Sequence, residues 1–145
     1  MARLTVAILF LLTAAACGQA AAVTASPKPN GTFTMGAMSA SGVTGTGQVY
    51  KGTGSFTVSI QLHGLLPSSS HVSHVHAGSC AKPGSVAYAL LQVVADAAGN
   101  ATATSTVSEY YSMPSTGWYV NVHSGPDLTE AAYAASVACG DMPAI

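Results

Sequence analysis

Three of the five histidines lie within ten residues, in HVSHVHAGSC at positions 71–80. If this segment is extended, side chains two residues apart lie on one face, about 7 Å apart at Cα. His74 and His76 would then direct two imidazoles to the same point in space. A third donor must come from elsewhere, and His123 in WYVNVHSGP is the distant histidine that falls in a plausible strand. We expect His74, His76 and His123 to bind one metal ion.

The alternative is that these histidines are structural. A single histidine on a strand is more often a hydrogen-bonded structural residue than a metal ligand. The HxH spacing, with a further histidine at a strand end, favours metal binding because no structural requirement explains it. Three imidazoles suit copper or zinc, and the donor set alone does not separate these two metals.

The chain begins with MARLTVAILFLLTAAAC, an apolar run with one arginine before it and small residues before Cys17. A run this short predicts a secretory signal peptide rather than a membrane span. Small residues followed at once by cysteine resemble the bacterial lipobox, although Ala14 stands where that motif prefers leucine. We expect residues 1–16 to be the signal peptide and Cys17 to carry a lipid that anchors the protein outside the cytoplasm, at the membrane or cell surface. Ordinary cleavage nearby, which would release a secreted protein, is the alternative.

The segment after Cys17 is rich in Ala, Ser, Pro and Asn and has no periodicity. We expect residues 17–31 to be a flexible tether and residues 32–145 to form one β domain. Without the signal peptide, three lysines face five acidic residues. Since there is no basic patch to neutralise phosphates, nucleic acid is excluded as a partner.

The clearest strand covers residues 55–62, in which apolar and polar side chains alternate. The apolar ones are Phe56, Val58, Ile60 and Leu62. A period of two predicts one face on a core and one in water. His63 continues the polar phase, so we expect it at the surface.

The histidine segment is expected to form the next strand. Residues 86–95 and 101–107 flank the turn DAAGN and predict a hairpin. Residues 117–123 alternate again and end at His123. Short strands about 8 to 12 residues apart, separated by Gly, Pro and Ser, indicate an all-β sandwich or barrel. Residues 128–135 have helical propensity but are too few to be stable alone.

With Cys17 assigned to the lipid, Cys80 and Cys139 remain as an even pair in an oxidising compartment. We expect them to form a disulfide that joins the histidine segment to the last strand. Closing a loop of about 60 residues is expected to stabilise the fold by roughly 3 to 4 kcal/mol on the chain-entropy model.

Four motifs resemble those of the Cu/Zn superoxide dismutases, in the same order. HVSHVHAGSC is similar to their HGFHVH segment and the following GxC, LQVVADAAGNATA to the strand and turn after their zinc loop, VNVH to the strand with their last copper ligand, and SVACG to RLACG. The match covers nearly all of residues 45–141. The resemblance implies a Greek-key β-barrel in which His74, His76 and His123 are copper ligands. It also implies the Cys80–Cys139 disulfide and places His71 beside the copper site without ligating it.

The chain also departs from these enzymes. Only AKPGSVAY connects Cys80 to the next strand, where the family has a long loop with the bridging histidine and the zinc ligands. Zinc is therefore not expected. Ser136 stands where RLACG has the arginine that guides superoxide, and the charged loop before it is reduced to DLTEAAYAA. Superoxide or another small anion would still reach an open position on copper, with weak dismutase activity or none.

A second resemblance is to the CHRD domain, a sandwich module of extracellular proteins with an HIH segment after a GL turn and a YVNVHT strand. WYVNVHSGP and the short distance from HVH to VNVH resemble this module, although its usual GEIRG is not present. The two resemblances imply one fold and two functions. One is a copper-binding, dismutase-like lipoprotein. The other is a non-catalytic surface module whose histidines are structural or bind metal incidentally. The sequence leaves this choice and the oligomeric state open.

Overall fold

The computed structural model describes residues 26–145, so that the expected signal peptide and Cys17 lie outside the described residues. Of the expected tether, residues 26–30 precede the first strand and Gly31 begins it. The strands are β1 (Gly31–Ala37), β2 (Thr44–Lys51), β3 (Phe56–His63), β4 (Ser70–His71), β5 (Ser73–Ser79), β6 (Lys82–Ala89), β7 (Val93–Val94), β8 (Ala101–Val107), β9 (Trp118–His123) and β10 (Ser136–Asp141).

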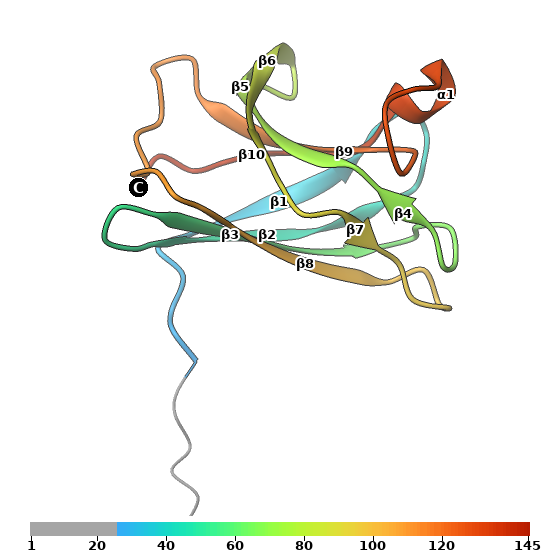
Figure 1. The fold of residues 1–145 in the computed structure, drawn as a ribbon, viewed down its shortest axis with the longest axis horizontal. Coiled ribbons are helices and arrows are strands. Elements are labelled where there is room, and N and C mark those ends of the chain that lie inside the picture. The colour runs from blue at the N-terminus through green and yellow to red at the C-terminus, as the bar shows by residue number, and fades with distance from the viewer. Residues whose placement is uncertain (1–25) are drawn as a thin grey trace, which may run out of the picture.

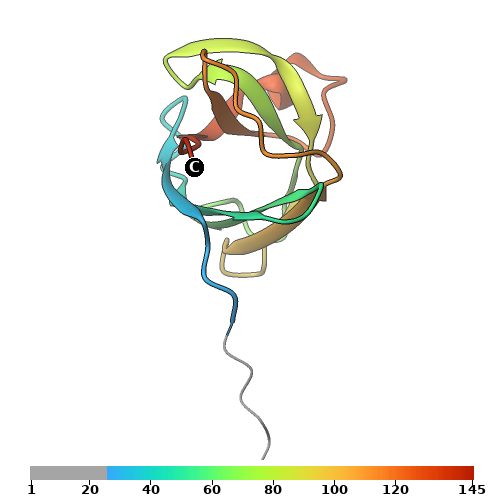
Figure 2. The ribbon, with the colours of Figure 1, turned by 90° about the vertical axis from the view of Figure 1, so that its left-hand side faces the viewer.

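The strands form a curled antiparallel sheet with the order β6-β5-β9-β10-β1-β2-β3-β8. Viewed from the end, the sheet bends round into an open barrel (Figures 1 and 2). Strands β4 and β7 pair separately. Strands β1, β2 and β3 are neighbours, whereas the chain crosses to the other end of the sheet from β3 to β5, from β6 to β8 and from β8 to β9. These crossings are Greek-key connections, and the predicted all-β Greek-key fold is confirmed.

Strand β3 shows how the sequence builds the core. Phe56, Val58, Ile60 and Leu62 are at most 2 % exposed, as the alternation predicts. The Phe56 ring stacks on Trp118 of β9 at 5.6 Å and meets Tyr88 of β6 edge-on at 5.4 Å. Burying each such side chain stabilises the fold by about 1.5 to 3 kcal/mol. This packing holds the two halves of the sheet together behind the histidine strands.

The predicted hairpin of residues 86–95 with residues 101–107 is not formed. Strand β6 begins at Lys82 and pairs with β5, β7 pairs with β4, and β8 pairs with β3. The apolar run is thus divided between β6 of the large sheet and β7 of the two-stranded sheet. Alternation predicts a strand but not its partner, because the partner depends on burial between segments that are distant in the sequence. AKPGSVAY, expected as a connection, is itself most of strand β6.

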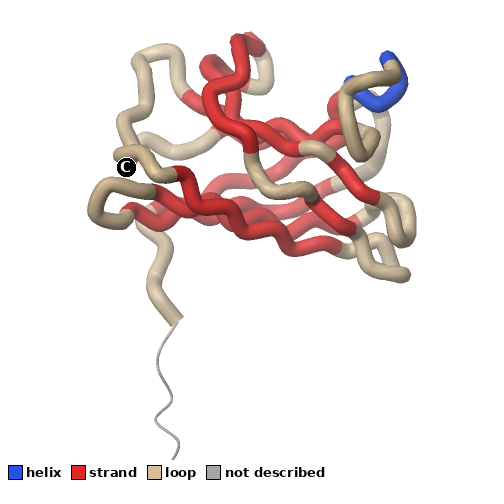
Figure 3. The backbone as a smooth tube through the Cα atoms, in the orientation of Figure 1, coloured by secondary structure: helices blue, strands red, loops and turns tan. Residues whose placement is uncertain are grey.

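Helix α1 (Ala131–Ala134) is the helical element among residues 26–145 and stands out beside the strands in Figure 3. It has four residues, all exposed, as expected of a stretch too short to be stable alone. In the described part of the chain, no helix is long and apolar enough to cross a membrane.

Candidate metal centre

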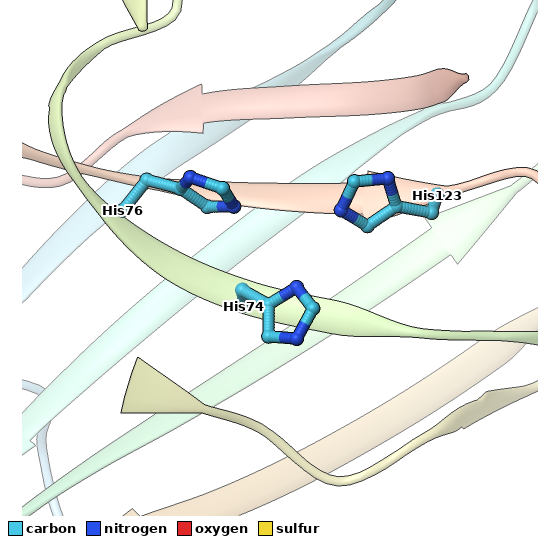
Figure 4. A group of neighbouring side chains, drawn as sticks. All are labelled: His74, His76 and His123. Atoms are coloured by element: carbon cyan, nitrogen blue, oxygen red, sulfur yellow. The ribbon is translucent and has the colours of Figure 1, made fainter. Parts of the chain in front are cut away.

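Adjacent strands β5 and β9 bring three histidines together (Figure 4). On β5, Val75 is buried in the core, so His74 and His76 point to the opposite face. The ring centres of His74 and His123 are 5.5 Å apart, those of His74 and His76 5.7 Å, and those of His76 and His123 6.3 Å. One possible ligand atom from each of the three side chains lies within 4.8 Å of those from the other two. All three histidines expected from the sequence therefore meet.

Hydrogen bonds determine which ring nitrogen of two histidines faces the cluster. Nδ1 of His76 lies 3.0 Å from the carbonyl oxygen of Gly84, and Nδ1 of His123 lies 2.8 Å from that of Ala134. Because a carbonyl oxygen only accepts, each Nδ1 must carry the hydrogen. The Nε2 of each neutral ring then has a lone pair free for another partner.

Two ring nitrogens of the cluster have no partner at all. Among the described residues, the buried side-chain nitrogen and oxygen atoms without a hydrogen bond are His74 Nδ1 and His76 Nε2. Leaving a buried polar atom unpaired costs free energy, and such atoms are rare in folded proteins. A cation between them would remove this cost. The residues therefore fit a metal ion, with His74 Nδ1, His76 Nε2 and His123 Nε2 as donor atoms.

The surroundings keep His74 neutral. Burial, followed by the neighbouring His123 and His76 rings, lowers the pKa of His74 below its ordinary value of 6.5. Each of these causes disfavours the protonated ring. Since only a neutral imidazole ligates a metal, the site is prepared for binding at neutral pH.

Two further residues of β9 complete the site. Tyr119 stacks on His76 with ring centres 5.0 Å apart, and Asn121 Nδ2 lies 3.2 Å from His123 Nε2. Both are buried. The sequence analysis did not single them out as site residues, although residues two and four positions before His123 share its face of the strand.

The other two histidines lie outside the cluster. His71 is buried beside it, and its Nδ1 donates to the backbone carbonyl oxygen of His123 at 2.8 Å. His63 is exposed at the end of β3, where its Nδ1 lies 2.8 Å from Asn100 Oδ1. The structure thus separates His63 from the site, as the polar phase of β3 predicts.

A disulfide joins Cys80, directly after β5, to Cys139 in β10, with Cα atoms 5.9 Å apart. Cys139 lies opposite Asn121 of β9 in the sheet. The backbone N–H of Cys80 donates to Asp141 Oδ1 at 2.7 Å. The predicted disulfide is therefore present, and it ties the end of β5 to β10, which pairs with the other side of β9.

The structure shows where the chain departs from the dismutase pattern, at the β5–β6 hairpin and at Ser136. Strands β5 and β6 form a tight hairpin in which Ser79 pairs with Lys82. This hairpin occupies the place where the resemblance implies a long metal-binding loop. Ser136 pairs directly with His123 across β9 and β10, so that the residue aligned with the guiding arginine lies next to the histidine cluster but carries a neutral hydroxyl.

Solved structures with the same fold support the predicted architecture. The Cu/Zn superoxide dismutase from Brucella abortus is 20 % identical and matches 78 % of this chain and 99 % of its own, with a TM-score of 0.57. A SOD-like protein from Bacillus subtilis is 15 % identical and matches 77 % of this chain and 97 % of its own, with a TM-score of 0.61. The β domain therefore has a Cu/Zn superoxide dismutase-like fold.

In sequence, the chain is related to the CHRD domain, the second of the two groups that its motifs resemble. No curated protein matches the chain. The model of the CHRD domain matches residues 13–126, which include the whole histidine cluster. The match extends over well more than half of the sequence, and both resemblances inferred from the motifs are confirmed. The chain belongs to the CHRD domain family.

Proposed function

We propose that the protein is an extracytoplasmic copper-binding protein of superoxide dismutase-like fold whose dismutase activity is weak or absent. The proposal rests on the two unpartnered nitrogens, His74 Nδ1 and His76 Nε2, which share the cluster with Nε2 of His123. Copper is favoured over zinc because the fold is similar to that of a Cu/Zn superoxide dismutase, while the short β5–β6 hairpin stands where the resemblance implies the loop with the zinc ligands.

The protein residues supply the binding and the geometry of the centre. Gly84 and Ala134 accept the Nδ1 hydrogens of His76 and His123, so these rings keep one orientation and one tautomer. Bound copper would supply one-electron exchange between Cu(II) and Cu(I). With three imidazole donors, the coordination sphere has room for water or a small anion such as superoxide.

The same residues explain why catalysis is expected to be weak. The tight β5–β6 hairpin carries no bridging histidine and no other side chain that would move a proton at the site. Ser136 supplies no positive charge, and the domain has more acidic residues than lysines. Anions are therefore not steered to the cluster by electrostatic attraction.

Copper titration of metal-free protein tests this proposal. We expect uptake of one equivalent of Cu(II), loss of tight binding in His123→Ala, and unchanged binding in His63→Ala. The His63 variant is the matched control, because this exposed ring lies outside the cluster. Equal losses from both substitutions, or no stoichiometric uptake by the wild type, would contradict the assignment.

The second candidate is a non-catalytic CHRD-like surface module. It is favoured by the family match and by the two bonds through which His76 and His123 hold the β6 backbone and the segment before β10. In that case His76→Ala should lower the free energy of unfolding of the metal-free protein by about 1 kcal/mol. Cu(II) would then leave the melting temperature of the wild type unchanged.

We further propose that Cys17 carries a lipid and anchors the domain to a membrane, with secretion as the alternative. The small residues before Cys17 and the linker composition after it support the anchor. Cys17→Ser should move the protein from the membrane fraction to the soluble fraction. A variant that still fractionates with membranes would refute the lipid anchor.

A further inference from the structure

Asn121 is a polar side chain buried at the centre of the metal site. It is 6 % exposed and lies directly opposite His74 on β5 and Cys139 on β10. Asparagine is depleted in strands, and a buried amide costs free energy unless its polar atoms are paired. A specific interaction of the Asn121 side chain must therefore compensate for the cost of burying its amide at this position.

The interaction of Asn121 involves a nitrogen that is assigned to the metal. Its Nδ2 donates to His123 Nε2 at 3.2 Å. Nε2 has one lone pair, which accepts this hydrogen bond or binds a metal, but not both. Metal binding at His123 must therefore release the amide hydrogen from its partner.

The distance between the amide and His123 Nε2 is compatible with two donors to the same ion. Two donors bonded at 2.0 to 2.1 Å to one tetrahedral ion lie about 3.3 Å apart. The separation between Asn121 Nδ2 and His123 Nε2 is 3.2 Å, close to this spacing. This spacing is therefore compatible with the end of the Asn121 side chain and His123 Nε2 binding the same ion.

When a cation binds at the cluster, the amide must turn so that Oδ1, and not Nδ2, faces the cation. The hydrogens on Nδ2 carry partial positive charge and are repelled by a cation, whereas Oδ1 is attracted to it. A rotation of the amide by about 180° exchanges the two atoms and leaves the shape of the side chain unchanged. We propose that Asn121 Oδ1 is the fourth protein donor of the metal centre, and that the amide holds His123 in place when no metal is bound.

This inference rests on the proposed metal binding and adds a reason for weak catalysis. An oxygen donor from Asn121 fills a coordination position that superoxide or water would otherwise take. The site then combines three imidazoles with one neutral oxygen. Such a set binds copper without leaving the same access to small anions as three imidazoles alone.

Two substitutions of Asn121 test the assignment through Cu(II) affinity. Asn121→Val removes the oxygen at similar volume and is expected to weaken binding about 10-fold or more. Asn121→Asp keeps an oxygen in the same place and adds negative charge, so it should bind Cu(II) at least as tightly as the wild type. Asn100→Asp adds the same charge beside His63, outside the cluster, and should leave the affinity unchanged.

The outcomes separate this inference from the proposed function. If Asn121→Val binds Cu(II) as tightly as the wild type or more tightly, the amide only competes for His123 and the inference is overturned. Should that variant fail to fold, Asn121→Asp decides, because weaker binding or an unchanged Cu(II) electron paramagnetic resonance spectrum contradicts oxygen ligation. A wild type that binds no Cu(II) refutes the proposed function itself.

Discussion

His71 and His123 are joined by a hydrogen bond from the ring Nδ1 of His71 to the backbone carbonyl oxygen of His123, 2.8 Å long. His71 is 3 % exposed, and its strand β4 directly precedes the ligand strand β5. His123 is thus held through its backbone by His71 and through its ring by the carbonyl oxygen of Ala134. His71, which lies outside the histidine cluster, therefore links the segment before β5 to the end of β9.

Removing this link should affect both stability and metal binding. His71→Leu leaves a buried carbonyl oxygen without its donor, and we expect the free energy of unfolding to fall by about 1 to 3 kcal/mol. Cu(II) affinity should fall about 10-fold, because the orientation of His123 is less restricted. Urea unfolding and copper titration measure the two effects, with His63→Leu as the exposed control. Unchanged copper affinity in a folded His71→Leu protein would show that the link does not orient the ligand.

The metal-free protein should lose stability as the pH falls below 6.5. Burial, and then His123 and His76, lowers the pKa of His74 in the folded protein, so below 6.5 the unfolded chain takes up its proton first. Above that pH the ring is neutral in both states and this contribution is constant. Thermal unfolding at several pH values measures the loss, and His74→Gln should reduce it. An equally steep loss in His74→Gln would assign the effect to other groups.

Gly84 should be required for the orientation of His76. A Cβ atom at Gly84 would overlap the carbonyl oxygen of Ala77, so Gly84→Ala must displace the backbone that accepts the His76 Nδ1 hydrogen. We expect Cu(II) affinity to fall about 10-fold. Gly36→Ala is the matched control in β1, since its Cβ would meet only Cys139 O at 3.9 Å. Equal affinities of the two variants would rule out this role of Gly84.

Loss of the disulfide should destabilise the whole domain. Cys80 and Cys139 are 59 residues apart, and a loop of that length corresponds to about 4 kcal/mol on the chain-entropy model. The double substitution Cys80→Ser with Cys139→Ser should lower the urea midpoint accordingly. Copper affinity should also fall, because Cys139 lies opposite Asn121 in the sheet. A double variant as stable as the wild type would mean that the sheet alone holds these segments.

Superoxide dismutation by the copper-loaded protein should be several orders of magnitude slower than diffusion control. A positioned acid or base contributes about 10²-fold or more, and the short β5–β6 hairpin carries no bridging histidine to take this role. Electrostatic steering, which raises association rates by roughly 10 to 10³, is lost with Ser136. Pulse radiolysis measures the rate constant. A value near the diffusion limit would contradict both arguments, and Ser136→Arg should raise a slow rate.

Much of the local structure was determined by the sequence itself. Alternation in residues 55–62 predicts both the strand and its buried face, because the direction of side chains along an extended chain depends only on neighbouring residues. The HxH spacing places His74 and His76 on one face for the same reason. The two cysteines that remain when Cys17 is assigned to a lipid predict their own pairing. His123 was expected at the site from its residue type and its strand.

Strand partners and hydrogen-bond partners were decided only by the tertiary structure. Residues 86–95 and 101–107 predict a hairpin, yet they pair with β4, β5 and β3, because burial between distant segments selects the partner. Hydrogen bonds to the carbonyl oxygens of Gly84 and Ala134 decide which nitrogens of His76 and His123 face the cluster. These two carbonyl groups belong to β6 and α1 and reach the histidines only in the folded chain. Asn121 acquires its place at the centre only when β9 lies between β5 and β10, since hydrogen bonds depend on distance in space and not in sequence.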